Sequence, residues 1–196
     1  MWTEAFYRFQ IKQTRIYAVC GILIPIVLFL SLAFALSYSP WFNWTQHALS
    51  DLGITGVSSF FFNLGMIICG ILTFVFSLGL STILSNKIGA YLLSVSSLAM
   101  IGIGIFPETI MGIHFVVSIT SFVLLAIALL VIGFTIITRN QAQRSIGVLA
   151  FVFVIPAMIG SFILLPSLKG IAIPEILVWF PAFIWMMIYS LRTMFL

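Results

Sequence analysis

Residues 112–137 read GIHFVVSITSFVLLAIALLVIGFTII, a stretch without a single charged side chain. A helix rises about 1.5 Å per residue and the hydrocarbon core of a bilayer is about 30 Å thick, so roughly 20 apolar residues suffice to cross it. The stretch therefore predicts a transmembrane helix. The whole chain supports this interpretation, because 63% of its residues are hydrophobic and only 6% are charged, against about 25% charged residues in soluble domains.

The same pattern recurs along the chain and predicts one transmembrane domain over residues 1–196. Prolines and short polar runs, such as Asn86-Lys87 and Phe106-Pro107-Glu108, separate the apolar segments. We therefore expect an all-α integral membrane protein, a six-helix bundle. Its spans are predicted near residues 16–38, 60–84, 88–106, 112–137, 145–165 and 174–194.

The basic residues are distributed unequally between the predicted loops. Only Lys169 falls on one side, whereas the others fall on the opposite side: Arg8, Lys12, Arg15, Lys87, Arg139, Arg144 and Arg192. Cytoplasmic loops carry an excess of Lys and Arg, so both termini are predicted to be cytoplasmic in a multi-pass protein of the cell membrane. Trp41, Trp44 and Trp179 are expected in an outer aromatic belt.

The first fifteen residues place apolar and charged side chains on different faces of a helix. Trp2 and Phe6 share one face, while Arg8 and Lys12 fall on another at four-residue spacing. This pattern is typical of a cytoplasmic interfacial helix over residues 1–15. The simpler alternative is an ordinary flank that fixes the orientation of the first span.

Small residues inside the spans predict close packing between helices. In lipid, glycines let helix backbones approach one another, and they recur in the second and third spans as Gly65, Gly70, Gly79, Gly102 and Gly104. Cys20 and Cys69 are expected at different depths, which disfavours a disulfide and indicates packing roles.

Most acidic residues and both histidines fall in segments predicted to reach the outer boundary of the membrane. Ionisable residues are rare at this depth unless they pair or take part in function. If residues 44–53 are helical, one face carries His47, Ser50 and Asp51. Glu108 and His114 follow the third span, and Glu175 begins the sixth, where it can stabilise a helix N-terminus. We predict one outward-facing site built from His47, Ser50, Asp51, Glu108 and His114.

Several chemistries suit the residues of this site. His47, Asp51, Glu108 and His114 could ligate zinc or another divalent metal, or act without metal as catalytic acids and bases. The two histidines could also ligate one haem. Alternatively, the groups form a hydrogen-bonded network that ties the outer loops together. The sequence holds no His-Glu-x-x-His, Cys-x-x-Cys-His or Gly-x-Ser-x-Gly signature that would decide between these interpretations.

Three stretches also carry a likeness to a known family. These are His47-Ala48-Leu49-Ser50-Asp51-Leu52-Gly53, then Phe62-Asn63-Leu64-Gly65, then Phe106-Pro107-Glu108 followed by His114, Ser118 and Phe122. The set resembles the family catalogued as domain of unknown function 998, small archaeal and bacterial multi-pass membrane proteins. The resemblance implies no established activity. Its motif residues here are Ser50, Asp51, Gly53, Asn63, Pro107, Glu108 and His114.

Three functional hypotheses follow. The first is a hydrolase or transferase for a lipid or lipid-linked substrate, with Ser50 as a nucleophile or a helix cap and Gly53 permitting a tight turn. The second is a non-catalytic subunit or binding protein within a membrane complex, because the chain has almost no soluble mass. The third is a haem-bearing electron carrier. The expected partners are the lipid bilayer and other membrane subunits, and the scattered basic residues exclude nucleic acid.

Overall fold

A computed structural model describes the backbone of residues 2–195 and the side chains of residues 15–195. Within this part of the chain, six helices are long and apolar enough to cross a membrane. This confirms the predicted all-α fold with six membrane-spanning helices. The helices are α1 (Trp2–Ser37), α2 (Gly56–Ile83), α3 (Ile88–Ile105), α4 (Met111–Arg139), α5 (Arg144–Leu164) and α6 (Ala172–Phe195).

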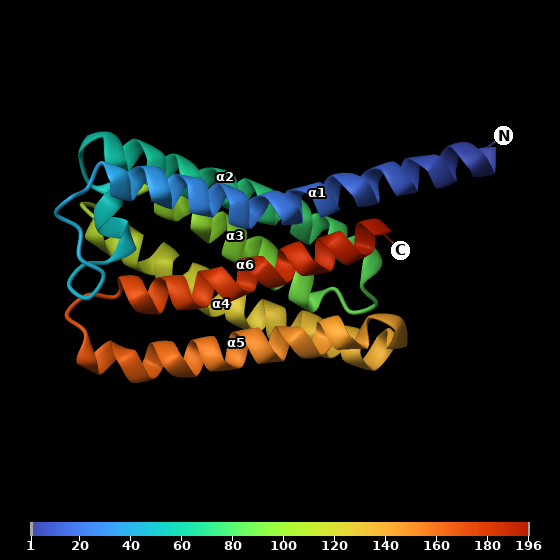
Figure 1. The fold of residues 1–196 in the computed structure, drawn as a ribbon. Helices are drawn as coiled ribbons and strands as arrows, with labels where there is room; N and C mark the ends of the chain where they lie inside the picture. The colour runs from blue at the N-terminus through green and yellow to red at the C-terminus, as the bar shows by residue number, and fades with distance from the viewer. Residues whose placement is uncertain (1, 196) are drawn as a thin grey trace.

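The six helices form a closed ring. Each packs against its neighbour in the chain, and α1 packs against α6 (Figure 1). Both chain termini lie at the same end of the bundle, which we call the termini end. The opposite end carries residues 38–55, 106–110 and 165–171 and is called the loop end. Which end faces the cytoplasm stays a prediction from the basic residues.

Helix α1 is continuous and projects beyond the rest of the bundle at the termini end (Figure 1). Residues 2–14 form its first turns, so they are helical, as the sequence predicts. The side chains of residues 1–14 lie outside the described residues. The amphipathic interfacial face over residues 1–15 therefore stays a prediction.

Glycines mark the closest approaches between helices. A Cβ atom on Gly70 of α2 would lie 2.9 Å from the carbonyl oxygen of Ser97 in α3. A Cβ atom on Gly104 of α3 would lie 2.5 Å from the carbonyl oxygen of Asn63 in α2. Each contact is too short for any larger residue, which confirms that these glycines allow helix backbones to touch.

Polar side chains add hydrogen bonds between helices inside the bundle. The indole Nε1 of Trp185 in α6 donates to the carbonyl oxygen of Ile146 in α5 at 2.8 Å. The thiol of Cys69 in α2 donates to the carbonyl oxygen of Ile24 in α1 at 3.6 Å. Cys20 and Cys69 are both free, in agreement with the predicted packing roles.

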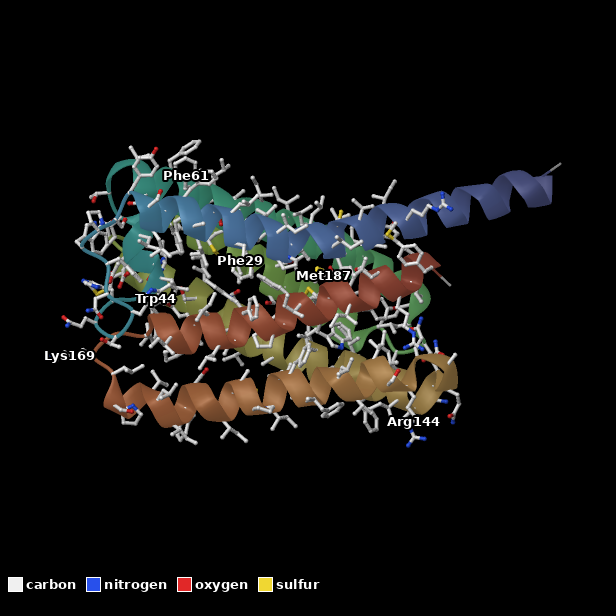
Figure 2. The ribbon with its side chains drawn as sticks, viewed as in Figure 1. Phe29, Trp44, Phe61, Arg144, Lys169 and Met187 are labelled. Atoms are coloured by element: carbon white, nitrogen blue, oxygen red, sulfur yellow. The ribbon has the colours of Figure 1, made fainter. Side chains whose placement is uncertain are left out.

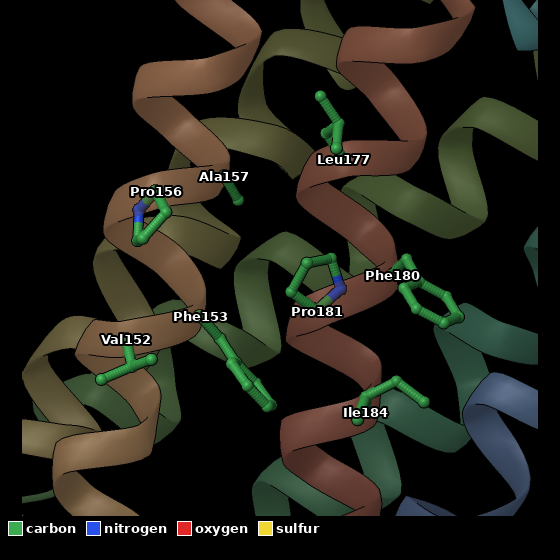
Figure 3. A pocket seen from close by; sticks show the side chains of 8 residues that line it. All are labelled: Val152, Phe153, Pro156, Ala157, Leu177, Phe180, Pro181 and Ile184. Carbon is green, nitrogen blue, oxygen red and sulfur yellow. The ribbon is translucent and has the colours of Figure 1, made fainter.

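An apolar cavity of about 370 Å³ lies between α5 and α6 (Figure 3). Pro156 and Pro181 line it from the two facing helices, and each lies inside its helix rather than at its end. Proline has no N–H, so the carbonyl four residues earlier loses its helical donor. Those carbonyls belong to Val152 and Leu177, which also line the cavity. The two helices thus enclose an apolar cavity that includes both of these carbonyl-bearing residues.

The tryptophans at the loop end have two different environments. Trp41 and Trp44 are 49% and 38% exposed, as an interfacial belt requires. Trp179 is only 1% exposed, and its ring stacks on Phe122 of α4 at a centroid distance of 4.7 Å. The prediction for Trp179 was wrong, because this residue lies one helical turn after Glu175 on the buried face of α6.

Candidate functional site

A short 3₁₀ helix, η1 (Leu49–Gly53), lies at the centre of the loop end. It packs against α2 and α6, and all its residues except Asp51 are buried. Ala48 just before it is extended, with φ −89° and ψ 157°. The predicted helix over residues 44–53 is therefore interrupted, and His47 does not share a helical face with Ser50 and Asp51. Ser50 is buried in η1, whereas His47 lies in the loop before it.

Two carboxylates bind the backbone at the start of η1. The N–H group of Ala48 donates to Oδ2 of Asp51 at 3.0 Å. This is one of the two hydrogen bonds that make up a capping box. The N–H group of Leu49 donates to Oε2 of Glu175 at 2.6 Å. Glu175 is only 8% exposed and belongs to the first turn of α6, where the helix dipole favours negative charge. Both acids therefore satisfy backbone donors that would otherwise be unpaired.

The third carboxylate binds a side chain of η1. The hydroxyl of Ser50 donates to Oε2 of Glu108 at 2.9 Å. Ser50 is therefore not a helix cap, because Asp51 has that role. Glu108 is half-buried in the connection between α3 and α4, and its Oε1 has no hydrogen-bond partner among the described residues. One oxygen of Glu108 is thus held in place while the other stays available.

His114 fixes the connection that carries Glu108. Its Nδ1 lies 2.7 Å from the carbonyl oxygen of Phe106, which can only accept, so Nδ1 carries the proton and donates. His114 is 7% exposed and faces the interior of the bundle rather than lipid. The imidazole therefore ties the first turn of α4 to the end of α3. That His114 shares one site with Glu108 and Asp51 stays a prediction.

His47 belongs to a different cluster. The N–H group of Asn43 donates to Nδ1 of His47 at 3.0 Å. The imidazole packs against the rings of Trp41 and Phe42 at centroid distances of 5.2 and 5.7 Å. Among the described side chains, no hydrogen bond or ring contact joins it to His114. The two histidines thus have separate sets of partners.

The loop around His47 is bound to the connection between α5 and α6. The N–H groups of Lys169 and Gly170 both donate to the carbonyl oxygen of Thr45 at 3.0 Å, and that of Ala172 donates to the carbonyl oxygen of His47 at 3.0 Å. Gly170 lies directly against the His47 backbone, where a Cβ atom would overlap main-chain atoms. These contacts hold the loop that precedes η1 against the connection between α5 and α6.

Gly53 and Asn63 connect η1 to α2. The Nδ2 group of Asn63 donates to the carbonyl oxygen of Gly53 at 3.0 Å. A Cβ atom on Gly53 would lie 2.5 Å from Oδ1 of Asn63 and 2.9 Å from the ring of Phe62. Gly53 does not have a positive φ, so its missing side chain serves the close approach to Asn63 and Phe62 rather than a left-handed backbone. The residue with positive φ is Gly56, at 72°, where α2 begins.

The structure thus gathers part of the predicted site. Ser50, Asp51 and Glu108 meet around η1, and both of these carboxylates lie close enough to Glu175 to act on it electrostatically. His114 supports this group through the backbone, and His47 lies in the adjoining loop. Within residues 15–195, no group of three or more His, Cys, Asp or Glu side chains is arranged to hold a metal ion.

A comparison with known protein families finds a match to this chain. A family profile described as "Protein of unknown function (DUF998)" matches residues 19–192. The chain belongs to this family. No curated protein and no solved structure matches it. In this DUF998 protein, the motif residues Ser50, Asp51, Gly53, Asn63 and Glu108 all contact η1 or form part of it.

Two features of the site had no clear signal in the sequence. Glu175 follows Pro174, a position at which an acid is usually explained by its own helix N-terminus, and nothing pointed to a bond with Leu49. Gly170 is one glycine in a short loop, and its contact with His47 depends on the tertiary fold. Both contacts join segments that are far apart in the chain.

Proposed function

We propose that this protein is a membrane-embedded hydrolase or transferase for a lipid or lipid-linked substrate, with Glu108 as its general base. The observation that supports this most directly is that the three carboxylates differ in their hydrogen-bond partners. Asp51 and Glu175 each bind a backbone N–H group, so they build the site. Glu108 is the only one held by a side-chain hydroxyl, from Ser50, and it is half-buried rather than buried.

The chemistry proposed for Glu108 is proton transfer. Ser50 fixes Oε2 and leaves Oε1 to take a proton from water or from a substrate hydroxyl. Ser50 is 6% exposed and donates its own hydrogen bond, so we assign it to orienting Glu108 rather than to nucleophilic attack. His114 positions the backbone that carries Glu108. No metal is part of this proposal.

The substrate class follows from the place of the site. η1 lies where six apolar helices end, and the described chain has no soluble domain that would deliver a water-soluble substrate. A lipid can reach this depth by lateral diffusion, with its head group at the level of the loop end. Glu108 would then meet the polar part of the molecule at the boundary between hydrocarbon and water.

The test is conversion of lipids by the full chain. The purified protein is reconstituted into vesicles made from a lipid extract of its host's membranes, and products are followed by mass spectrometry. We expect Glu108→Gln to lower the rate by about 100-fold or more, the usual contribution of a general base. Glu175→Gln is the matched control, because its amide oxygen can still accept from Leu49 and activity should remain. Conversion that survives Glu108→Gln would contradict the proposal.

The second candidate is a non-catalytic subunit or binding protein of a membrane complex. Asp51 and Glu175 support it, since both acids have purely structural partners in the backbone of residues 48 and 49. If the wild-type protein converts no lipid, and if mild detergent extracts it together with other membrane proteins in fixed stoichiometry, this second function replaces the first.

A further inference from the structure

A polar cavity lies at the termini end, far from η1 along the helices. It has a volume of about 120 Å³ and its walls come from the ends of α2 and α4, from the short η2 helix (Gln141–Gln143) and from α6. One water molecule takes up about 30 Å³ of liquid, so the cavity has room for a compact polyatomic group. Its polar lining consists of Ser85, Thr135, Arg139, Asn140, Gln143 and Tyr189.

The lining is rich in hydrogen-bond donors. Arg139 is exposed, ends α4 and has no hydrogen-bond or ion-pair partner within the described part of the chain. Oδ1 of Asn140 accepts from the N–H group of Gln143 at 3.2 Å, which leaves the amide hydrogens of Asn140 free to donate. The side chains of Gln143 and Ser85 have no partners among the described residues, and both can donate.

Among the described residues, every charged side chain at this end of the bundle is basic. The described acidic side chains, Asp51, Glu108 and Glu175, all lie at the loop end. At the termini end, Arg192 is already bound, donating to Oγ of Ser145 at 3.1 Å and to the carbonyl oxygen of Ala142 at 2.9 Å. Within residues 15–195, Arg139 is therefore a cation without a counter-charge beside a polar cavity.

We propose that this cavity binds an anionic phosphate group, either the head group of an anionic phospholipid or free phosphate. The planar guanidinium of Arg139 can form two parallel hydrogen bonds to phosphate oxygens. The amides of Asn140 and Gln143 and the hydroxyl of Ser85 supply donors for the remaining oxygens. The cavity lies at the ends of spans, the depth at which lipid phosphates occur, and basic pockets between helices are known to take such head groups.

The test uses native mass spectrometry of the full chain in detergent with added phosphatidylglycerol, and phosphatidylcholine as the zwitterionic comparison. We expect one preferential phosphatidylglycerol adduct. Arg139→Gln should weaken it at least about tenfold, since hydrogen bonds to charged groups contribute that much. Arg144→Gln is the matched control, because Arg144 is exposed at the same end but does not line the cavity. It should change the affinity less than about twofold.

A second arm distinguishes the source of the phosphate. The thermal midpoint is measured with sodium phosphate against sodium chloride at equal ionic strength. A rise in phosphate that Arg139→Gln removes, without a lipid adduct, assigns the site to free phosphate. Ser85→Trp, which fills the cavity without changing charge, should block either ligand. Equal weakening by Arg139→Gln and Arg144→Gln, or a wild-type protein that binds neither probe, would overturn the proposal.

Discussion

At the loop end, three consecutive residues donate to three different carboxylates, whereas at the termini end the cation that lines the cavity has no hydrogen-bond or ion-pair partner among the described residues. The donors are the N–H of Ala48, the N–H of Leu49 and the hydroxyl of Ser50. Arg139 and Arg144 have no such partners among the described residues. Figure 2 shows how far apart the two ends lie, with Lys169 at one and Arg144 at the other.

This difference shows where the polar groups of each end find their hydrogen-bond partners. η1 is buried, so each of its polar groups must find a partner inside the protein or lose free energy. The guanidinium of Arg139 is exposed at the end of a span, where water and lipid phosphates can bind it. We therefore expect substitutions at the loop end to change stability and those at the termini end to change ligand binding.

The most severe expected way to break the loop end is Gly170→Ala. The new Cβ would overlap the backbone of His47, which cannot move without losing the hydrogen bonds that Thr45 and His47 accept. We expect a loss of about 3 kcal/mol in the free energy of unfolding, from overpacking and broken hydrogen bonds together. The measurement is unfolding of the purified protein in mixed micelles by increasing denaturing detergent.

Gly112→Ala is the matched control for this substitution. Gly112 lies in the first turn of α4 at the same end of the bundle, and a Cβ atom there would meet nothing within 4 Å. Alanine favours the helix over glycine, so no loss of stability is expected. Equal destabilisation by the two variants would show that the contact between Gly170 and His47 does not hold the loop end together.

A smaller effect is expected when the bond between Glu175 and Leu49 is removed. Glu175→Ala leaves a buried N–H group without an acceptor, which costs about 1–3 kcal/mol. Glu175→Gln keeps an oxygen in place, so it should retain most of the stability. The same unfolding measurement compares the two variants. If alanine and glutamine are equally destabilising, the charge of Glu175 matters more than the hydrogen bond.

The sequence predicted the transmembrane fold well because each span is encoded locally. A run such as residues 112–137 needs only its own apolar residues to identify it, and the structure gives α4 almost the same ends. The candidate site was harder to predict. Ser50 and Glu108 were placed together only at the level of segments, and Glu175 joins Leu49 across more than 100 residues of chain.

The errors in the prediction have a common physical cause. Trp179 looked interfacial because of its residue type, but the face of α6 on which it lies is covered by Phe122. The prediction placed His47 on one helical face with Ser50 and Asp51. Ala48 is extended, so the 3₁₀ helix begins only at Leu49 and excludes His47. Both outcomes depend on tertiary contacts between helices and loops, which periodicity along one segment does not encode.

The smallest expected change in the free energy of unfolding is that of Glu108→Gln. It distinguishes Glu108, the proposed general base, from Asp51 and Glu175, which have structural roles. Glu108→Gln should leave the free energy of unfolding within about 0.5 kcal/mol of the wild type, because the amide oxygen can still accept from Ser50. Any change should be stabilising, since a charged group near lipid is costly. Ser50→Ala, which removes the donor instead, is expected to cost about 1 kcal/mol. A large loss of stability for Glu108→Gln would mean that its charge holds the fold, and Glu108 would then join Asp51 and Glu175 as a structural acid.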